Sequence, residues 1–132
     1  MERRFNGFNP QHMTNLCWAF ATAGFESERF FACLSYVLKK RGMKDFNPVA
    51  LGQLCWSLGK LGYEAMGLFN VIALECTEPR LNGFGTQALS NVAYGFGQLN
   101  VRLESFYHAL EQQMRKRGLS QFVSNRDGGI VF

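Results

Sequence analysis

The sequence predicts an all-α fold, an α-solenoid built from about three and a half helix-turn-helix repeats. Three observations predict it. Similar segments return at a fixed offset, helix-capping residues bound these segments, and their apolar side chains follow a helical period. A fixed period of roughly 20 to 50 residues is typical of arrays in which each unit buries one face on the next.

The repeat is clearest at the start of the chain. Phe8 to Phe25 aligns without a gap with Phe46 to Tyr63, and 7 of these 18 positions are identical. A looser copy begins at Phe84, so the period is 38 positions, and a partial copy begins at Phe122, where Asp127 to Gly129 are poor helix formers. The predicted repeats span residues 8–45, 46–83, 84–121 and 122–132. A chain that stops inside a repeat is expected to be a fragment of a longer array.

Each repeat is predicted to contain two helices, A and B. Helix A begins after Asn9-Pro10 or Asn47-Pro48, because Asn favours the N-cap and Pro the first helical position. It ends at Gly24 or Gly62, and Asn100 occupies this position in the third repeat, since these residues tolerate the left-handed conformation. The B helices are predicted from near Ser27 to Arg41, near Glu64 to Glu78, where Pro79 ends the helix, and near Leu103 to Arg117.

Apolar residues at helical spacing predict the core. In the A helices these columns start at Met13, Leu16, Cys17 and Phe20, and in the B helices at Phe30, Phe31 and Leu34. A column of small residues, Ala21, Gly59 and Gly97, predicts close approach of neighbouring helices. The aromatic column Trp18, Trp56 and Tyr94 is interpreted mainly as core packing, with base stacking as the alternative.

Function is expected in columns that stay small or polar without a packing reason. Four such columns follow a spacing of 3, 4 and 3 on the A helices, which places them on one face. Small residues (Ala50, Ala88, Ala19, Gly95) would leave room there for a ligand. The amides could read the edges of unstacked bases, or they could form a ladder between repeats; both interpretations remain open. The predicted groove residues are His12, Asn15, Thr22, Gln53, Ser57, Lys60, Asn91 and Gln98.

Basic clusters recur at the ends of two predicted B helices, two periods apart. Contact with phosphates is one interpretation, and favourable interaction with the helix C-terminus is the other. The net charge of +4 suits a polyanionic partner. The predicted phosphate-contacting residues are Lys39, Lys40, Arg41, Lys44, Arg115, Lys116 and Arg117.

Other classes of function have little sequence support. The four cysteines, Cys17, Cys33, Cys55 and Cys76, show no metal-ligand spacing and lie in apolar helical patterns, which predicts reduced, buried thiols and no metal. No apolar run reaches the length of a membrane span. Repeat sequence begins within eight residues of the start, so we expect either that no targeting segment exists or that the chain is an excised piece. His12 and His108 lack partners at catalytic spacing. We therefore expect no enzyme and no cofactor.

The motif Phe-Asn-Pro-x-x-hydrophobic-x-Asn/Gln-Leu-Cys-Trp, which returns with the 38-residue period, resembles the octotricopeptide repeat and its near relatives in organelle RNA-binding proteins. The Pro-Pro-Pro-Glu-Trp stretch often associated with that repeat is missing. The resemblance implies paired helices in a superhelix and location in a mitochondrial or chloroplast matrix. It also implies binding of single-stranded or ribosomal RNA, for transcript stabilisation, processing or translation or as part of an organelle ribosome, with ribosomal or other organelle proteins as further partners.

No membrane or DNA partner is expected. A function of another class stays open, a scaffold whose curved face binds a protein helix or peptide. Phosphate binding should weaken steeply with salt, whereas an apolar peptide contact should not. Salt dependence therefore separates the two hypotheses.

Overall fold

The computed structural model describes residues 9–63 and 66–118, and this part of the chain is all-helical. The partial repeat predicted at 122–132 lies outside the described residues. Three helices of the predicted A type are α1 (Pro10–Ala23), α3 (Pro48–Leu61) and α6 (Thr86–Gln98). Those of the B type are α2 (Glu28–Arg41), α4 (Met66–Leu74) and α7 (Glu104–Arg117), and a short helix α5 (Glu78–Leu81) follows α4.

The predicted capping residues set the helix boundaries. The Asn9 and Asn47 side chains accept hydrogen bonds from the backbone N–H groups of His12 and Ala50, and a proline follows each cap. Gly24 and Gly62 take the left-handed conformation after α1 and α3. Asn100 does the same after α6, with φ +55°, and is the one non-glycine residue with positive φ in the described chain. The first residues of α1, α3 and α6 are therefore 38 positions apart.

The second B helix differs from its prediction. The sequence analysis expects it to continue to Glu78, but α4 ends at Leu74 and α5 begins after Thr77. Pro79 lacks a backbone N–H, and in a continuous helix its ring would clash with the Glu75 carbonyl four residues earlier. The chain therefore breaks before the proline and starts a new turn, with Pro79 in its first positions.

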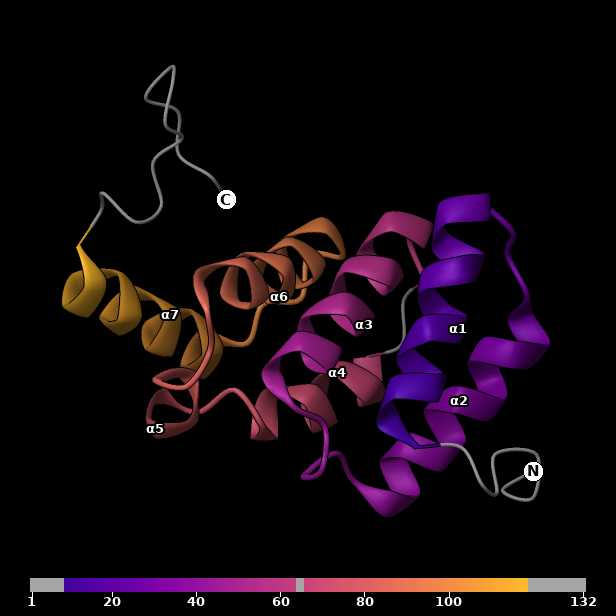
Figure 1. Ribbon diagram of the computed structural model, residues 1–132, viewed down its shortest axis with the longest axis horizontal. Helices are drawn as coiled ribbons and strands as arrows, with labels where there is room; N and C mark the ends of the chain where they lie inside the picture. Colours follow the sequence, from indigo (N-terminus) through magenta and orange to yellow (C-terminus); the bar gives the residue numbers. More distant parts are fainter. Residues whose placement is uncertain (1–8, 64–65, 119–132) are drawn as a thin grey trace.

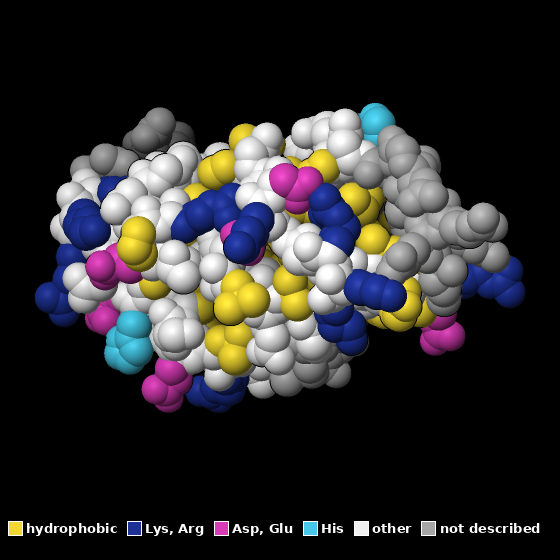
Figure 2. Space-filling view, turned by 90° about the horizontal axis from the view of Figure 1, so that it is seen from below, with side chains coloured by type: hydrophobic (Ala, Val, Ile, Leu, Met, Phe, Trp, Pro, Cys, Tyr) yellow, Lys and Arg dark blue, Asp and Glu magenta, His cyan; other side chains and the backbone are white. Residues whose placement is uncertain are grey.

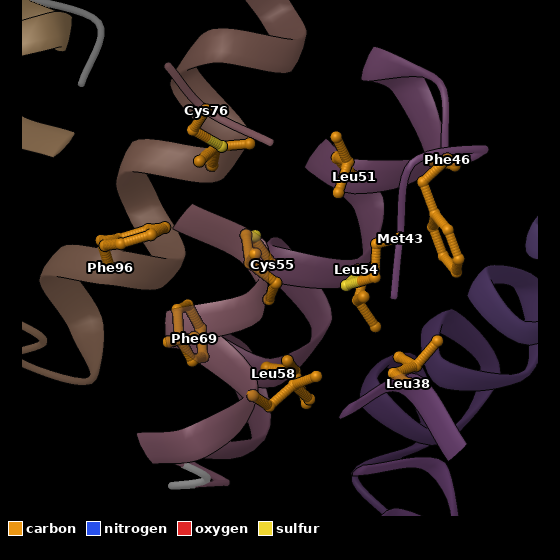
Figure 3. Packing of buried hydrophobic residues seen from close by; sticks show 14 of the residues in the cluster. Leu38, Met43, Phe46, Leu51, Leu54, Cys55, Leu58, Phe69, Cys76 and Phe96 are labelled. Carbon is orange, nitrogen blue, oxygen red and sulfur yellow. The ribbon is translucent and has the colours of Figure 1, made fainter. Parts of the chain in front are cut away.

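The A-type helices lie side by side, with α3 between α1 and α6, while α2 and α4 pack together and α5 contacts α7 (Figure 1). Apolar side chains from all these helices form one core, of which Leu54 and Leu58 of α3, Phe69 of α4 and Phe96 of α6 are seen in Figure 3. The predicted core columns are buried in α3 and α4. Nearer the ends of the row they are partly exposed, at Leu16 and Phe20 of α1, Phe30 of α2 and Ala93 of α6, or exposed, at Tyr107 of α7. The packing of neighbours, rather than the pattern alone, therefore completes the burial.

α3 and α6 lie so close together that their contact leaves no room for a side chain at Gly95 and little at Gly59. A Cβ atom added to Gly95 would lie 2.4 Å from the Cys55 backbone oxygen, and one added to Gly59 would lie 3.0 Å from the Gly95 Cα. Gly59 belongs to the column predicted to permit close approach, and this prediction is confirmed for it. Gly97 of the same column is different, because nothing lies within 4 Å of its Cβ position.

Candidate nucleic-acid interface

One surface of the three A-type helices carries aromatic and polar side chains in a regular pattern. It consists of four columns at spacing 4, 3 and 4, which lie on one face of each helix. Its members are exposed or partly exposed in every helix. We call this the A-helix surface, and its residues are Gln11, Asn15, Trp18 and Thr22 of α1, Val49, Gln53, Trp56 and Lys60 of α3, and Gln87, Asn91, Tyr94 and Gln98 of α6.

The aromatic column lies on this surface, and the core-packing interpretation is wrong for Trp18, which is exposed, whereas Trp56 and Tyr94 are partly buried and rest on each other. Trp18 is 49% exposed, and Trp56 and Tyr94 are partly exposed. The rings of Trp56 and Tyr94 stack across α3 and α6, with centroids 6.2 Å apart and planes 27° from parallel. The Lys60 ammonium lies 6.0 Å from the Trp56 ring centre, which adds a cation to the aromatic pair.

The amide column lies beside the aromatic rings. Gln11 Nε2 donates to Asn15 Oδ1 at 2.9 Å, and Gln87 Nε2 donates to Asn91 Oδ1 at 3.0 Å. These equivalent bonds stay within one helix, and no side-chain hydrogen bond between repeats joins the amide column among the described residues. The ladder interpretation therefore has no support in this part of the chain.

Gln53, the central amide, lacks such a partner. Val49 occupies the position of Gln11 and Gln87, and the buried Oε1 of Gln53 has no hydrogen-bond partner within the described chain. A buried acceptor without a partner costs about 1–3 kcal/mol.

Two predicted groove residues have structural roles. His12 is exposed, but its Nδ1 accepts the Asn9 backbone N–H in a capping box at the start of α1. Ser57 is fully buried, and its hydroxyl donates to the Gln53 backbone oxygen within α3. The prediction that small residues form the floor of the groove is also wrong for Ala50, Ala88 and Gly95, because these residues are buried between neighbouring A-type helices.

The other predicted groove residues, Asn15, Thr22, Gln53, Lys60, Asn91 and Gln98, lie on the A-helix surface. The adjacent columns of Gln11 and Trp18, rather than those of His12 and Ala19, complete the open face. A depression lies at its α6 end, lined by Trp56 of α3 and, on α6, by Gln87, Ser90, Asn91, Ala93, Tyr94, Gly97 and Gln98.

The predicted phosphate-binding cations divide into two groups. Arg41 pairs with Asp45 at 2.6 Å, and Arg117 donates to the backbone oxygens of Leu81 and Phe84 at 3.0 and 2.6 Å. Arg117 is therefore a structural residue that ties α7 to the loop before α6.

The sequence analysis missed Arg80, which donates in the same way to the Phe46 oxygen, the counterpart of Phe84 one repeat earlier, and also pairs with Glu75. The sequence carried a signal for this residue. Pro79 occupies the column of Arg41 and Arg117, and the second repeat has its arginine one position later, at Arg80. Arg80 and Arg117 therefore support the fold rather than a ligand, whereas Arg41 is exposed and makes only a surface pair with Asp45.

The second group of cations remains exposed to solvent: Lys39, Lys40, Lys44, Arg115 and Lys116. The Lys40 ammonium lies 5.6 Å from the Tyr36 ring centre, Lys116 contacts Asn82 at 3.3 Å, and Arg115 lies 4.0 Å from Glu111. Ion pairs and contacts this exposed contribute little to stability. Figure 2 looks at the end of the molecule where α2 finishes and α3 starts, and Lys and Arg side chains are spread across this face.

The four cysteines are free and buried, as the sequence predicts. Burial raises the pKa of the Cys17 and Cys55 thiols well above their ordinary value and that of Cys76 to about 12. Thiols in this state are poor nucleophiles and poor metal ligands, because the thiolate is the reactive form. Within the described residues, no group of His, Cys, Asp and Glu side chains is arranged to hold a metal, and no helix is long and apolar enough to cross a membrane.

Comparison of the chain with protein-family models, with curated proteins and with solved structures finds no match.

Proposed function

We propose that the chain is part of an α-solenoid of 38-residue helix-turn-helix repeats, similar to octotricopeptide repeats, and that it binds single-stranded RNA along the A-helix surface. Its targets would be organelle transcripts or ribosomal RNA, as the resemblance implies, and it would act by binding without catalysis. The repeat interpretation is supported by the starts of α1, α3 and α6 at Pro10, Pro48 and Thr86, one period apart, and by the side-by-side packing of these helices.

The aromatic column carries the proposal. Trp18, Trp56 and Tyr94 occupy the same position of successive A-type helices, and each leaves part of its ring open to solvent. Trp18 is half exposed, and the stacking of Trp56 on Tyr94 still leaves part of each side chain in solvent, so the column offers apolar area that the fold does not bury. Stacking of a base on such a ring contributes about 1–3 kcal/mol and tolerates any base, because every base has a π face.

The neighbouring columns supply the other parts of a single-strand site. The amides of Asn15, Gln53 and Asn91 can donate to and accept from base edges, and Gln53 has an acceptor without a partner. Lys60, which is exposed on the same surface beside the Trp56 ring, supplies a cation for a phosphate. Rings, amides and cations together match the way proteins bind unstacked strands.

The test uses the two tryptophans, since both lie on the A-helix surface and the chain has no others. Their intrinsic fluorescence should be quenched when a single-stranded RNA oligonucleotide of mixed sequence stacks on them. The Trp18→Ala variant should lose about 5- to 150-fold in affinity, which corresponds to the stacking energy above. Tyr36→Ala is the matched control, because Tyr36 is similarly exposed but lies on α2.

The affinity should also fall steeply as salt is raised. If Trp18→Ala and Tyr36→Ala bind RNA equally well, or if salt has no effect, RNA binding at this surface is refuted.

A protein-binding scaffold is the second candidate, and the exposed Val49 favours it. This side chain is 58% exposed in the middle of the A-helix surface, at the position that holds Gln11 and Gln87 in the other repeats. An apolar residue there suits the apolar face of a peptide helix better than a phosphate chain. Binding to a peptide that persists at high salt, without RNA binding at low salt, would support this candidate.

A further inference from the structure

A groove runs between α4 and α7, the B-type helices of two neighbouring repeats. It has a volume of about 430 Å³. Ala73 of α4 and Phe106 and Ala109 of α7 line its apolar part, and Thr77 and Glu78 line its polar part. We call it the B-helix groove. Described residues bound it on both sides, so it is a feature of the junction between two repeats.

The groove is open because the second B-type helix is short. α2 has 14 residues, whereas α4 has 9 and ends at Leu74, before the chain reaches Pro79. The last turn, which in α2 carries Lys39, is therefore missing beside α7. Thr77 occupies the column of Lys39, and its short side chain leaves the space uncovered.

The junction between α2 and α4 shows what occupies the same place one repeat earlier. There the Lys39 side chain extends from α2 and lies against α4 at Gly67. A Cβ atom added to Gly67 would lie 3.0 Å from Cδ and 3.1 Å from Nζ of Lys39. Ser105 of α7 occupies the column of Gly67 and lines the B-helix groove. The space beside Ser105 thus corresponds to one that holds the stem and ammonium group of a lysine in the earlier repeat.

The charge of the groove suits a cation from outside. Glu78 is exposed, and among the described residues its carboxylate has no hydrogen bond or ion pair. Lys40 stands in the same column of the first repeat, so the charge at this position is reversed. The Ser105 hydroxyl and the Gln112 amide, which also line the groove, offer further oxygen acceptors. These acceptors around an apolar floor fit a lysine side chain, which keeps its ammonium in water while its stem lies on apolar surface.

Apolar side chains beside the groove favour a polypeptide as the source of this cation. Leu74, the last residue of α4, is 71% exposed, and Tyr36 in the same column of α2 is 44% exposed. Both lie on the solvent-exposed side of the B-type helices. A free amine would leave them uncovered, whereas the residues that flank a lysine in a protein segment can pack on them.

We propose that the B-helix groove binds a lysine side chain presented by a partner protein. The stem lies on Ala73 and Ala109, the ammonium reaches Glu78 and the Ser105 hydroxyl, and apolar residues next to the lysine cover Leu74. The partner thus supplies the lysine that the first repeat carries itself. This surface belongs to the B-type helices, so the proposal is independent of RNA binding along the A-helix surface.

The probe is a capped peptide in which one lysine stands between two leucines, added to the isotope-labelled full chain and followed by NMR. Its binding should shift the amide signals of Thr77, Ser105 and Gln112, with a dissociation constant of about 1 mM or lower. The same peptide with norleucine in place of lysine lacks the charge and should bind about two- to fivefold more weakly. n-Butylammonium, which is the lysine side chain alone, should also bind more weakly than the lysine peptide, because it leaves Leu74 uncovered.

Three substitutions at exposed positions locate the site. Thr77→Lys fills the groove from within, as in the earlier repeat, and should reduce peptide binding below detection; Thr77 makes no side-chain cap hydrogen bond, so the fold should be retained. Glu78→Gln should weaken binding of the lysine peptide by about two- to fivefold and leave that of the norleucine peptide unchanged. Glu111→Gln removes an exposed carboxylate elsewhere on α7 and should bind like the wild type.

Four results would overturn the proposal. The lysine peptide could cause no shifts at the groove up to roughly tenfold the expected dissociation constant. The norleucine peptide could bind as tightly as the lysine peptide, or Thr77→Lys could leave binding unchanged. If n-butylammonium binds as tightly as the lysine peptide, the groove takes a free amine, and a protein partner is refuted.

Discussion

The close approach of α3 and α6 makes Gly95→Ala the sharpest test of the packing. The added Cβ would lie 2.4 Å from the oxygen, 2.8 Å from the carbonyl carbon and 2.9 Å from the Cβ of Cys55. None of these atoms can rotate away, so the helices must separate by about 1 Å to reach ordinary contact distance. Overpacking of this kind costs about 1–3 kcal/mol, and alanine's better helix propensity offsets about 0.5–1 kcal/mol of it. We expect a net loss of about 1–2 kcal/mol in the free energy of unfolding.

The measurement is urea and thermal unfolding followed by circular dichroism. The expected loss corresponds to a fall of about 3–10 °C in Tm for a chain of this size. Gly97→Ala is the matched control two residues along the same helix. Because its Cβ would meet nothing within 4 Å, it should be neutral or up to about 1 kcal/mol more stable than the wild type. Equal stability of the two variants would refute the close contact between α3 and α6.

Two further predictions concern the arginine and cysteine side chains. Arg117→Met should destabilise the protein by about 1.5–3 kcal/mol, because the guanidinium bonds to two backbone carbonyls are lost; urea unfolding measures it, and the exposed Arg115→Met should change little. An equal effect of the two substitutions would contradict a structural role for Arg117. Stability should also fall as pH rises above 9, the ordinary pKa of a thiol, because Cys76 keeps its proton in the folded state up to a pKa of about 12 while the unfolded chain releases it. Urea midpoints below and above pH 9 test this, and a Cys76→Ala variant with the same alkaline loss would show that the thiol is not the cause.

The candidate site was predicted in part. The polar columns of Asn15 and Thr22 were placed on an open face, and the structure puts them there. The third column was predicted one position too late along the helix. The prediction placed Ala19 on the open face, whereas the structure places Trp18 there, and both residues lie near the edge of the apolar stripe. A tryptophan beside such a stripe matches the pattern of a core residue, so hydrophobic periodicity assigned it to the interior. The direction of the neighbouring helix decided otherwise.

Local chemistry in the sequence determined where the helices begin and end. The side chains of Asn9 and Asn47 satisfy backbone donors three residues away, and Gly24 and Asn100 adopt conformations that few other residues tolerate. These interactions need no distant partner, so the sequence alone predicts them. The 38-residue period and the buried stripe are readable for the same reason.

Only the tertiary structure decided which side of each A-type helix meets its neighbour and which faces solvent. Gly95 tolerates no side chain because Cys55, 40 positions earlier, lies against it. Arg117 is structural because the carbonyl of Phe84, 33 positions earlier, accepts its hydrogen bond. Such contacts depend on how helices cross in space, and a single helix carries no record of that direction. The open rings of Trp18, Trp56 and Tyr94 therefore became visible only when the helices were placed side by side.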